Sequence, residues 1–306
     1  MNRKALVFGG SGFIGSHVVV ELLQRGYKVL NYDRNPFPLD EGKDNYSFVQ
    51  GNMVNGEQVI SLMQEFCPSS VYNFASECDI RRCMENPYVV IFDTTTNLHI
   101  LEGMRRLASS LPKSSSQPLP HLVYASSVYV HNELSGPYGI GKRSCEDWIR
   151  YYASRYGFTF TLLRYGTVYG PGAGGGNSVR RIIEEALKTG KISYYGTGEE
   201  VREYIHVDDV ARCSVQVLDQ GYEKNMAVVV SGICPTKAKD LVRMLKDILG
   251  EEYEMEFRGE KVFDHYEITP YKSTVRPVRK IVLDAYFDLG AGLLQVVEDL
   301  RSERND

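Results

Sequence analysis

The segment Gly9–Gly15, which reads Gly-Gly-Ser-Gly-Phe-Ile-Gly, constrains the fold of this chain more than any other feature. It lies between an apolar segment, Lys4–Phe8, that is typical of a strand and an amphipathic segment, Phe13–Arg25, that is typical of a helix closed by Gly26. Such glycines allow a tight turn and a close approach of the backbone to a pyrophosphate at the helix N-terminus. A glycine-rich turn without a ligand is the alternative, but the strand before it and the helix after it favour a dinucleotide site.

The first half of the chain alternates strand-like and helix-like segments, which favours a doubly wound parallel sheet. Further strands are expected at residues 27–32, 46–49, 71–74, 121–125 and 158–164, and helices at 56–66, 81–108 and 138–156. The glycine-rich run Tyr169–Gly176 breaks this pattern. We therefore expect an α/β fold with a Rossmann-type dinucleotide-binding domain over residues 1–170, to which segments at about 200–232 return. Residues 171–306 are expected to form mainly a smaller α/β substrate-binding lobe.

Composition excludes several classes of protein. The chain has 306 residues, of which 43% are hydrophobic and 24% charged, as in ordinary globular proteins. A net charge of −4 gives no reason to expect nucleic acid or an anionic membrane as a partner. We find no apolar window long enough for a transmembrane helix and no signal peptide, so a cytoplasmic protein is expected. Its six cysteines form no CxxC pair, which argues against a metal site or a disulfide framework.

Asp33 follows the glycine turn by 18 residues and ends the second expected strand. A carboxylate at this place can bind the hydroxyl groups of the adenosine ribose. Its charge would repel a 2′-phosphate and so favours NAD over NADP. Arg34 keeps NADP open as an alternative, because an arginine there can accommodate that phosphate.

Tyr138 and Lys142 lie four residues apart and therefore share one face of the expected helix. A phenol is a poor acid or base at neutral pH, since its unperturbed pKa is about 10, but a nearby ammonium favours the phenolate. Such a pair can move a proton on or off a substrate hydroxyl while a nicotinamide takes or gives a hydride. In a chain with 21 tyrosines the spacing alone says little, and it gains meaning from the glycine turn.

With these motifs the chain resembles the extended short-chain dehydrogenase/reductases, the nucleotide-sugar epimerase/dehydratase family, over nearly its whole length. Besides the glycine turn and the tyrosine–lysine pair, Tyr124–Tyr129, Arg164–Pro171 and Tyr195–Asp209 are similar to signatures of that family. The resemblance implies NAD as the cofactor and a nucleotide sugar as the substrate. It also assigns acid/base catalysis to Tyr138, and contact with the nicotinamide ribose to Lys142, which would lower the pKa of the tyrosine.

The resemblance assigns to Ser127 a hydrogen bond with the reacting sugar oxygen. Ser126 remains an alternative, because the segment before Tyr129 is shorter than usual. The full set of residues implied for the cofactor is Gly9, Gly12, Phe13, Ile14, Gly15, Asp33, Arg34, Asn52, Met53, Phe74, Ala75, Tyr138 and Lys142.

For the substrate the resemblance implies Ser127, Asn177, Arg202 and Arg276. Each arginine could equally be a solvated surface cation, and Asn177 could simply cap the helix that follows it. The chain also departs from the family pattern at three positions, where the family usually has aspartate or asparagine: Asn52, Asp93 and Thr167.

The segment after Ser127 bears on the reaction. A 4,6-dehydratase commonly has Asp-Glu there, but this chain has Val128-Tyr129, which disfavours dehydration. Epimerisation through a transient 4-keto intermediate is expected, with net C4 dehydrogenation or ketoreduction as the alternative. A reductase of small carbonyl compounds and a non-catalytic NAD-binding scaffold remain further alternatives. Only ten residues separate Ser127 from Tyr138, so the pocket is expected to be open or completed by Ala173–Gly176.

A homodimer is also expected. Members of the family often pair two helices from each subunit, here residues 81–108 and 138–156. The second helix carries Trp148, Ile149, Tyr151 and Tyr152, which is more apolar surface than a solvated face needs. The alternative is that these side chains pack on their own sheet.

Overall fold

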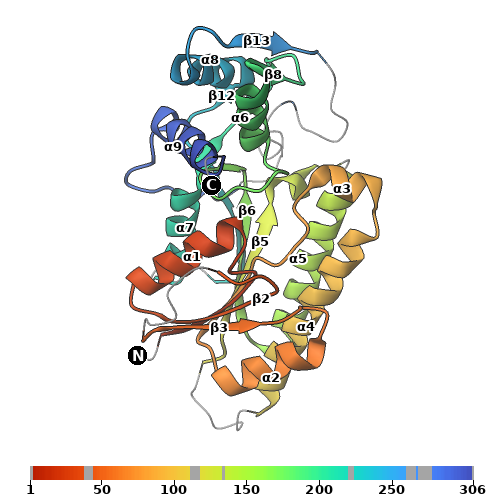
Figure 1. The fold of residues 1–306 in the computed structure, drawn as a ribbon. Coiled ribbons are helices and arrows are strands. Elements are labelled where there is room, and N and C mark those ends of the chain that lie inside the picture. The colour runs from red at the N-terminus through yellow and green to blue at the C-terminus, as the bar shows by residue number, and fades with distance from the viewer. Residues whose placement is uncertain are drawn as a thin grey trace.

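A seven-stranded parallel sheet forms the centre of the larger part of the molecule (Figure 1). The structure is a computed structural model that describes residues 3–37, 44–110, 118–132, 135–219, 224–259, 267 and 278–304. In spatial order the strands are β11 (Met226–Val230), β6 (Thr159–Tyr165), β5 (His121–Ser127), β4 (Ser70–Asn73), β1 (Lys4–Phe8), β2 (Lys28–Asp33) and β3 (Tyr46–Gln50). The expected doubly wound, Rossmann-type sheet is confirmed. Its winding direction reverses between β1 and β4, which is where sheets of this kind bind ligands.

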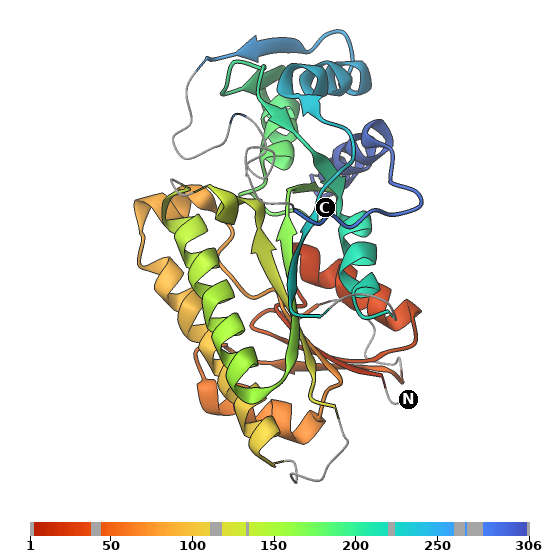
Figure 2. The same ribbon diagram turned by 180° about the vertical axis from the view of Figure 1, so that it is seen from behind.

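Helices cover both faces of this sheet. On one face lie α1 (Phe13–Gln24) and α7 (Val207–Gln216), and on the other lie α2 (Gly56–Phe66), α4 (Val89–Ser110) and α5 (Gly136–Tyr156). Figure 2, seen from behind, shows α4 and α5 side by side. Alternate residues of β1 serve the two cores, since Ala5 and Val7 pack towards α1 while Leu6 and Phe8 pack towards α4. Among the described helices, none is long and apolar enough to cross a membrane.

A smaller lobe lies above the sheet in Figure 1 and has a core of its own. It contains α6 (Ser178–Thr189), α8 (Ala238–Leu249), α9 (Leu289–Ser302) and the parallel pair β8 (Lys191–Tyr194) and β13 (Glu254–Phe257). Two further pairs of short strands are formed by segments that connect the large sheet with the smaller lobe along the chain. They are β7 (Thr167–Tyr169) with β10 (Tyr204–His206), and β9 (Val201–Arg202) with β12 (Thr236–Lys237). After β10 the chain returns to the larger part, where α7 packs on α1 and β11 joins the sheet edge. The domain boundary near residue 170 stays a prediction.

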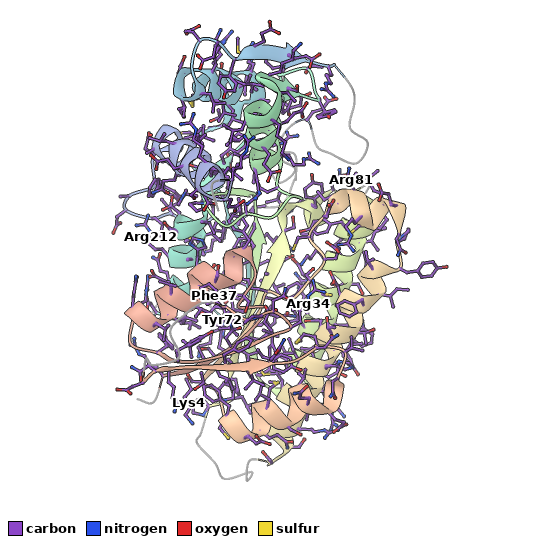
Figure 3. All side chains as sticks on the ribbon, in the orientation of Figure 1. Lys4, Arg34, Phe37, Tyr72, Arg81 and Arg212 are labelled. Atoms are coloured by element: carbon purple, nitrogen blue, oxygen red, sulfur yellow. The ribbon has the colours of Figure 1, made fainter. Side chains whose placement is uncertain are left out.

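The single helix expected over residues 81–108 is wrong. The structure has two helices there, α3 (Ile80–Glu85) and α4, separated by Asn86–Tyr88. Pro87 has no N–H to donate and disfavours helical backbone at the residue before it, and Asn86 accordingly has φ −138° and ψ 87°. The break places α3 at the end of the sheet nearest the smaller lobe, where Arg81 is labelled in Figure 3.

Candidate active site

The glycine turn has the backbone geometry that its sequence requires. Gly9 has φ +78°, and a Cβ atom added to it would lie 2.6 Å from the backbone nitrogen of Ala75. A Cβ atom on Gly15 would lie 2.1 Å from the carbonyl oxygen of Gly9. Gly12 is the N-cap of α1 and provides no side-chain cap, and the first turn of the helix holds no acidic residue. The N-terminus of α1 is therefore suited to a pyrophosphate.

Asp33 lies beside this turn at the carboxyl end of β2. Its carboxylate accepts hydrogen bonds from the backbone N–H of Ser11, at 3.0 Å, and of Asn35, at 3.0 Å. These bonds fix the side chain next to the glycine turn, where it could accept hydrogen bonds from the hydroxyl groups of an adenosine ribose. Arg34 is exposed just past the end of β2 (Figure 3).

Four of the other residues expected to bind the cofactor follow the ends of β3 and β4, at the same edge of the sheet. The side chain of Asn52 accepts a 3.1 Å hydrogen bond from the backbone of Val54, and Met53 is buried. Phe74 stacks on Tyr72 with the ring centroids 5.9 Å apart. Ala75 contacts the glycine turn at Gly9, whereas Phe13 and Ile14 pack partly against the core beneath α1.

Ser127 and Ser126 occupy different environments at the end of β5, because successive strand residues point to opposite faces. The hydroxyl of Ser127 accepts a hydrogen bond from the N–H of Tyr129 at 3.3 Å, and it lies close enough to the phenol of Tyr138 to lower its pKa. The hydroxyl of Ser126 instead donates to Glu146 Oε1 at 2.6 Å. The geometry therefore favours Ser127 as the partner of the tyrosine.

Lys142 is held close to Tyr138 by α5. Its Nζ lies 5.8 Å from the centroid of the Tyr138 ring, and only 3% of the residue is exposed. The ammonium donates to the carbonyl oxygen of Ala125 at 3.0 Å and to Ser76 Oγ at 2.9 Å. Two strand ends, β4 and β5, thus fix the position of this charge.

The pKa of Tyr138 differs from the sequence-based expectation in its net direction. Burial raises the pKa of the phenol to about 12, although the charge of Lys142 and the nearby hydroxyl of Ser127 act to lower it. The lysine therefore has the expected effect, but desolvation of the phenolate is larger. Without a ligand the phenol holds its proton at neutral pH.

Asn177 is the N-cap of α6, which was the alternative to substrate binding. Its Oδ1 accepts the backbone N–H groups of Val179 and Arg180, and its Nδ2 donates to the carbonyl of Val168 at 2.8 Å. The preceding glycine run lies close to the segment after β4, since a Cβ atom on Gly176 would lie 3.4 Å from the side chain of Asp79.

Of the two arginines expected to bind the substrate, the structure describes only Arg202. Arg202 lies on β9, and its guanidinium donates to the carbonyl oxygens of Val201, at 3.1 Å, and Glu267, at 3.3 Å. Its contact with a substrate phosphate stays a prediction. Arg276 lies outside the described residues.

The sequence did not reveal Ser76 as part of the site. This serine joins Lys142 to Asp93, because its hydroxyl accepts from the ammonium and donates to the carboxylate. The one feature of the sequence that could have indicated this serine is its position directly after Ala75, a residue expected to bind the cofactor. From the sequence, Asp93 was identified only as a departure from the family pattern.

The comparison with protein families decides the class. The family described as the NAD dependent epimerase/dehydratase family matches residues 5–230. The chain belongs to this family. The expected enzyme class and NAD as the cofactor agree with it, and the glycine turn and Asp33 provide a matching site.

Individual members of the NAD dependent epimerase/dehydratase family resemble the chain over most of its length. A putative UDP-glucose 4-epimerase of Methanocaldococcus jannaschii is 27% identical over 318 residues, which cover 97% of this chain and 98% of the relative. A dTDP-glucose 4,6-dehydratase of Xanthomonas campestris pv. campestris is 29% identical, covering 71% of this chain and 68% of the relative. The crystal structure of Thermotoga maritima UDP-glucose 4-epimerase with UDP-glucose is 26% identical, with a TM-score of 0.77 and coverage of 98% and 99%. Epimerases and dehydratases both occur among these relatives, so the reaction has to be argued from the site.

Proposed function

We propose that the protein epimerises a nucleotide-linked sugar through a transient 4-keto intermediate. The observation that carries this proposal is the convergence of Ser127, Tyr138 and Lys142 at the end of β5, on a sheet whose glycine turn suits NAD. When bound, NAD supplies hydride transfer from the sugar carbon and back to it. The protein must then hold the sugar oxygen and move its proton.

Each of the three side chains has a distinct part in that proton transfer. Tyr138 takes the proton of the sugar hydroxyl during oxidation and gives it back when the ketone is reduced. Ser127 donates a hydrogen bond to the same oxygen, which stabilises the charge that develops there. Lys142 stabilises the phenolate through its nearby ammonium. When bound, the cofactor would return the hydride to the opposite face of the ketone, which would invert the carbon.

The described carboxylates near the site do not favour dehydration. The segment after Ser127 forms a short 3-10 helix, η1 (Val128–His131), whose first three residues are apolar or aromatic and buried. On the loop after β4, Glu77 forms a 2.9 Å ion pair with Arg82, and Asp79 caps α3. These carboxylates already have partners. Net C4 dehydrogenation or ketoreduction uses the same three residues and remains the second candidate.

The test is to identify the released cofactor and the products from a panel of UDP-, GDP-, CDP- and dTDP-linked sugars. An epimerase should hold NAD and yield an isomer of unchanged mass, and Tyr138→Phe should remove this activity. A product lighter or heavier by two hydrogens would establish the second candidate. Loss of water would establish a dehydratase. A Tyr138→Phe variant as active as the wild type would contradict the proposal.

We also propose that two copies pair through α4 and α5, as the sequence suggested. The exposed apolar side chains of this face are Tyr88, Ile91, Phe92, Ile140, Trp148 and Tyr151. Not all of the expected aromatic surface is available, because Ile149 is buried in the core of its own subunit. Tyr152 is also partly taken up within its own subunit, because its hydroxyl donates a 2.7 Å hydrogen bond to the carboxylate of Glu102 on α4. A second copy is the occupant expected for a face with several exposed apolar side chains.

A further inference from the structure

A buried carboxylate lies one hydroxyl group away from the ammonium of Lys142. Ser76 Oγ accepts from Lys142 Nζ at 2.9 Å and donates to Asp93 Oδ2. The other oxygen of Asp93 accepts the backbone N–H of Glu77 at 2.9 Å. Asp93 is 7% exposed and Lys142 is 3% exposed, so water screens this pair little.

The ammonium of Lys142 interacts with both the carboxylate of Asp93 and the phenol of Tyr138. Burial alone would lower the pKa of Lys142, but the charges of Tyr138 and Asp93 contribute to a net rise. The charge of Asp93 in turn contributes to the raised pKa of Tyr138. A carboxylate closer to the ammonium would weaken its effect on the phenol, and a missing carboxylate would strengthen it.

We propose that Asp93 and Ser76 are positioning residues that set how strongly Lys142 acts on Tyr138. The carboxylate of Asp93, on α4, attracts the ammonium, and the hydroxyl of Ser76 lies between them and limits the approach. This inference rests on the function proposed for Tyr138. It assigns opposite effects to the two residues, which a purely structural role would not produce.

The Asp93→Asn variant has a way to satisfy its hydrogen bonds. The hydroxyl of Ser76 lies 3.2 Å from the carbonyl oxygen of Glu77 and could donate to it when the stronger carboxylate acceptor is lost. The asparagine carbonyl could then accept the N–H of Glu77, while its amide donates to the serine. We therefore expect the variant to fold. Thermal unfolding of each variant checks this.

The test is the titration of Tyr138 in NAD-bound protein, followed by carbon-13 NMR of tyrosines labelled at Cζ. Oxidised NAD is used because its positively charged ring favours the phenolate. The Tyr138→Phe variant assigns the resonance. Asp93→Asn should lower the pH of titration by about one unit, and Ser76→Ala should raise it. Asp79→Asn is the control, because it removes a carboxylate that caps α3 and has no bond to Ser76.

Two results would overturn the inference: titration unchanged in both variants, or displaced in the same direction in both. A displacement in Asp79→Asn as large as that in Asp93→Asn would also contradict it, since the effect would then be one of general charge. The titration needs bound NAD but no turnover. A protein that converts no nucleotide sugar would therefore contradict the proposed function and still leave this result readable.

Discussion

Ser126 donates a 2.6 Å hydrogen bond to the carboxylate of Glu146, a buried residue of α5. The same carboxylate also binds Arg164 through two hydrogen bonds, at 2.9 and 2.7 Å. This network keeps the hydroxyl of Ser126 within the protein interior, whereas the hydroxyl of the next residue, Ser127, acts to lower the pKa of Tyr138. We therefore expect the two adjacent serines to have separate functions, Ser126 in stability and Ser127 in the proposed chemistry.

Ser127→Ala should lower kcat for the epimerisation about a hundredfold, because one donor to the developing oxyanion is lost. Steady-state kinetics on the substrate found in the panel would measure this. Ser126→Ala is the matched control and should lower the free energy of unfolding with little effect on kcat. The reverse pattern would show that Ser126 is the active-site serine.

Glu146→Gln should lower the free energy of unfolding by about 3 kcal/mol, because it leaves the charge of Arg164 without its buried partner. Urea unfolding at neutral pH measures this. Asp147→Asn removes a neighbouring, exposed ion pair with Arg150 and should cost less than about 1 kcal/mol. Equal losses in the two variants would contradict the network described here.

The same ion pair predicts how stability depends on pH. Burial alone would raise the pKa of Glu146, but the hydrogen bonds and charge of Arg164 give a net lowering. The stabilisation is therefore present above the pKa of the unfolded glutamate and is lost as pH falls through the lower pKa of the folded state. Unfolding measured between neutral and acidic pH should show a smaller acid-induced loss in Glu146→Gln. An identical loss would argue that other groups dominate.

The first hydride transfer should become faster as pH rises. Since burial raises the pKa of Tyr138 to about 12, only a small fraction of the free protein holds the phenolate at neutral pH. Well below the pKa, that fraction grows about tenfold for each pH unit. Single-turnover reduction of bound NAD, followed by absorbance, would test this. A rate that falls with rising pH would mean that another group is the base.

Gly15→Ala should abolish retention of NAD, since its Cβ atom would lie 2.1 Å from the carbonyl oxygen of Gly9 and displace the turn. The measurement is the amount of cofactor that copurifies, together with calorimetric titration of NAD. Gly174→Ala is the control, because nothing lies within 4 Å of its added Cβ atom. Normal NAD binding by Gly15→Ala would contradict the assignment of the turn.

Trp148→Glu should convert the expected dimer into a monomer, because it places a charge among the exposed apolar side chains of α4 and α5. Analytical ultracentrifugation measures the mass. Met244→Glu changes a comparably exposed residue on α8 and should leave the dimer intact, since Met244 is 37% and Trp148 39% exposed. A wild-type protein that is monomeric at micromolar concentration would refute the proposed pairing.

The sequence predicted the sheet well because each strand and helix has local signals. The expected strand at Lys4–Phe8 and the helix at residues 56–66 have the predicted limits, and the other predicted strands differ by at most two residues. Pro87 was also visible in the sequence. Its consequence, the separate helix α3, was missed because the flanking segments both have helical patterns.

The details of the site depend on contacts between distant segments, which local patterns do not reveal. The argument for Ser127 over Ser126 rests on Glu146, which holds the hydroxyl of Ser126 and lies on another element. The link from Lys142 through Ser76 to Asp93 joins residues that are far apart in sequence. The pKa of Tyr138 could not be anticipated either, since the sequence shows the neighbouring lysine but not the extent of burial.

The most direct test of the central claim uses a nucleotide sugar that carries deuterium at C4, incubated with protein and its bound NAD alone. The account predicts an epimeric product that keeps the deuterium at C4 and has unchanged mass, because the hydride leaves and returns within one turnover. Accumulation of reduced cofactor in proportion to product, or a product that has lost water, would contradict it.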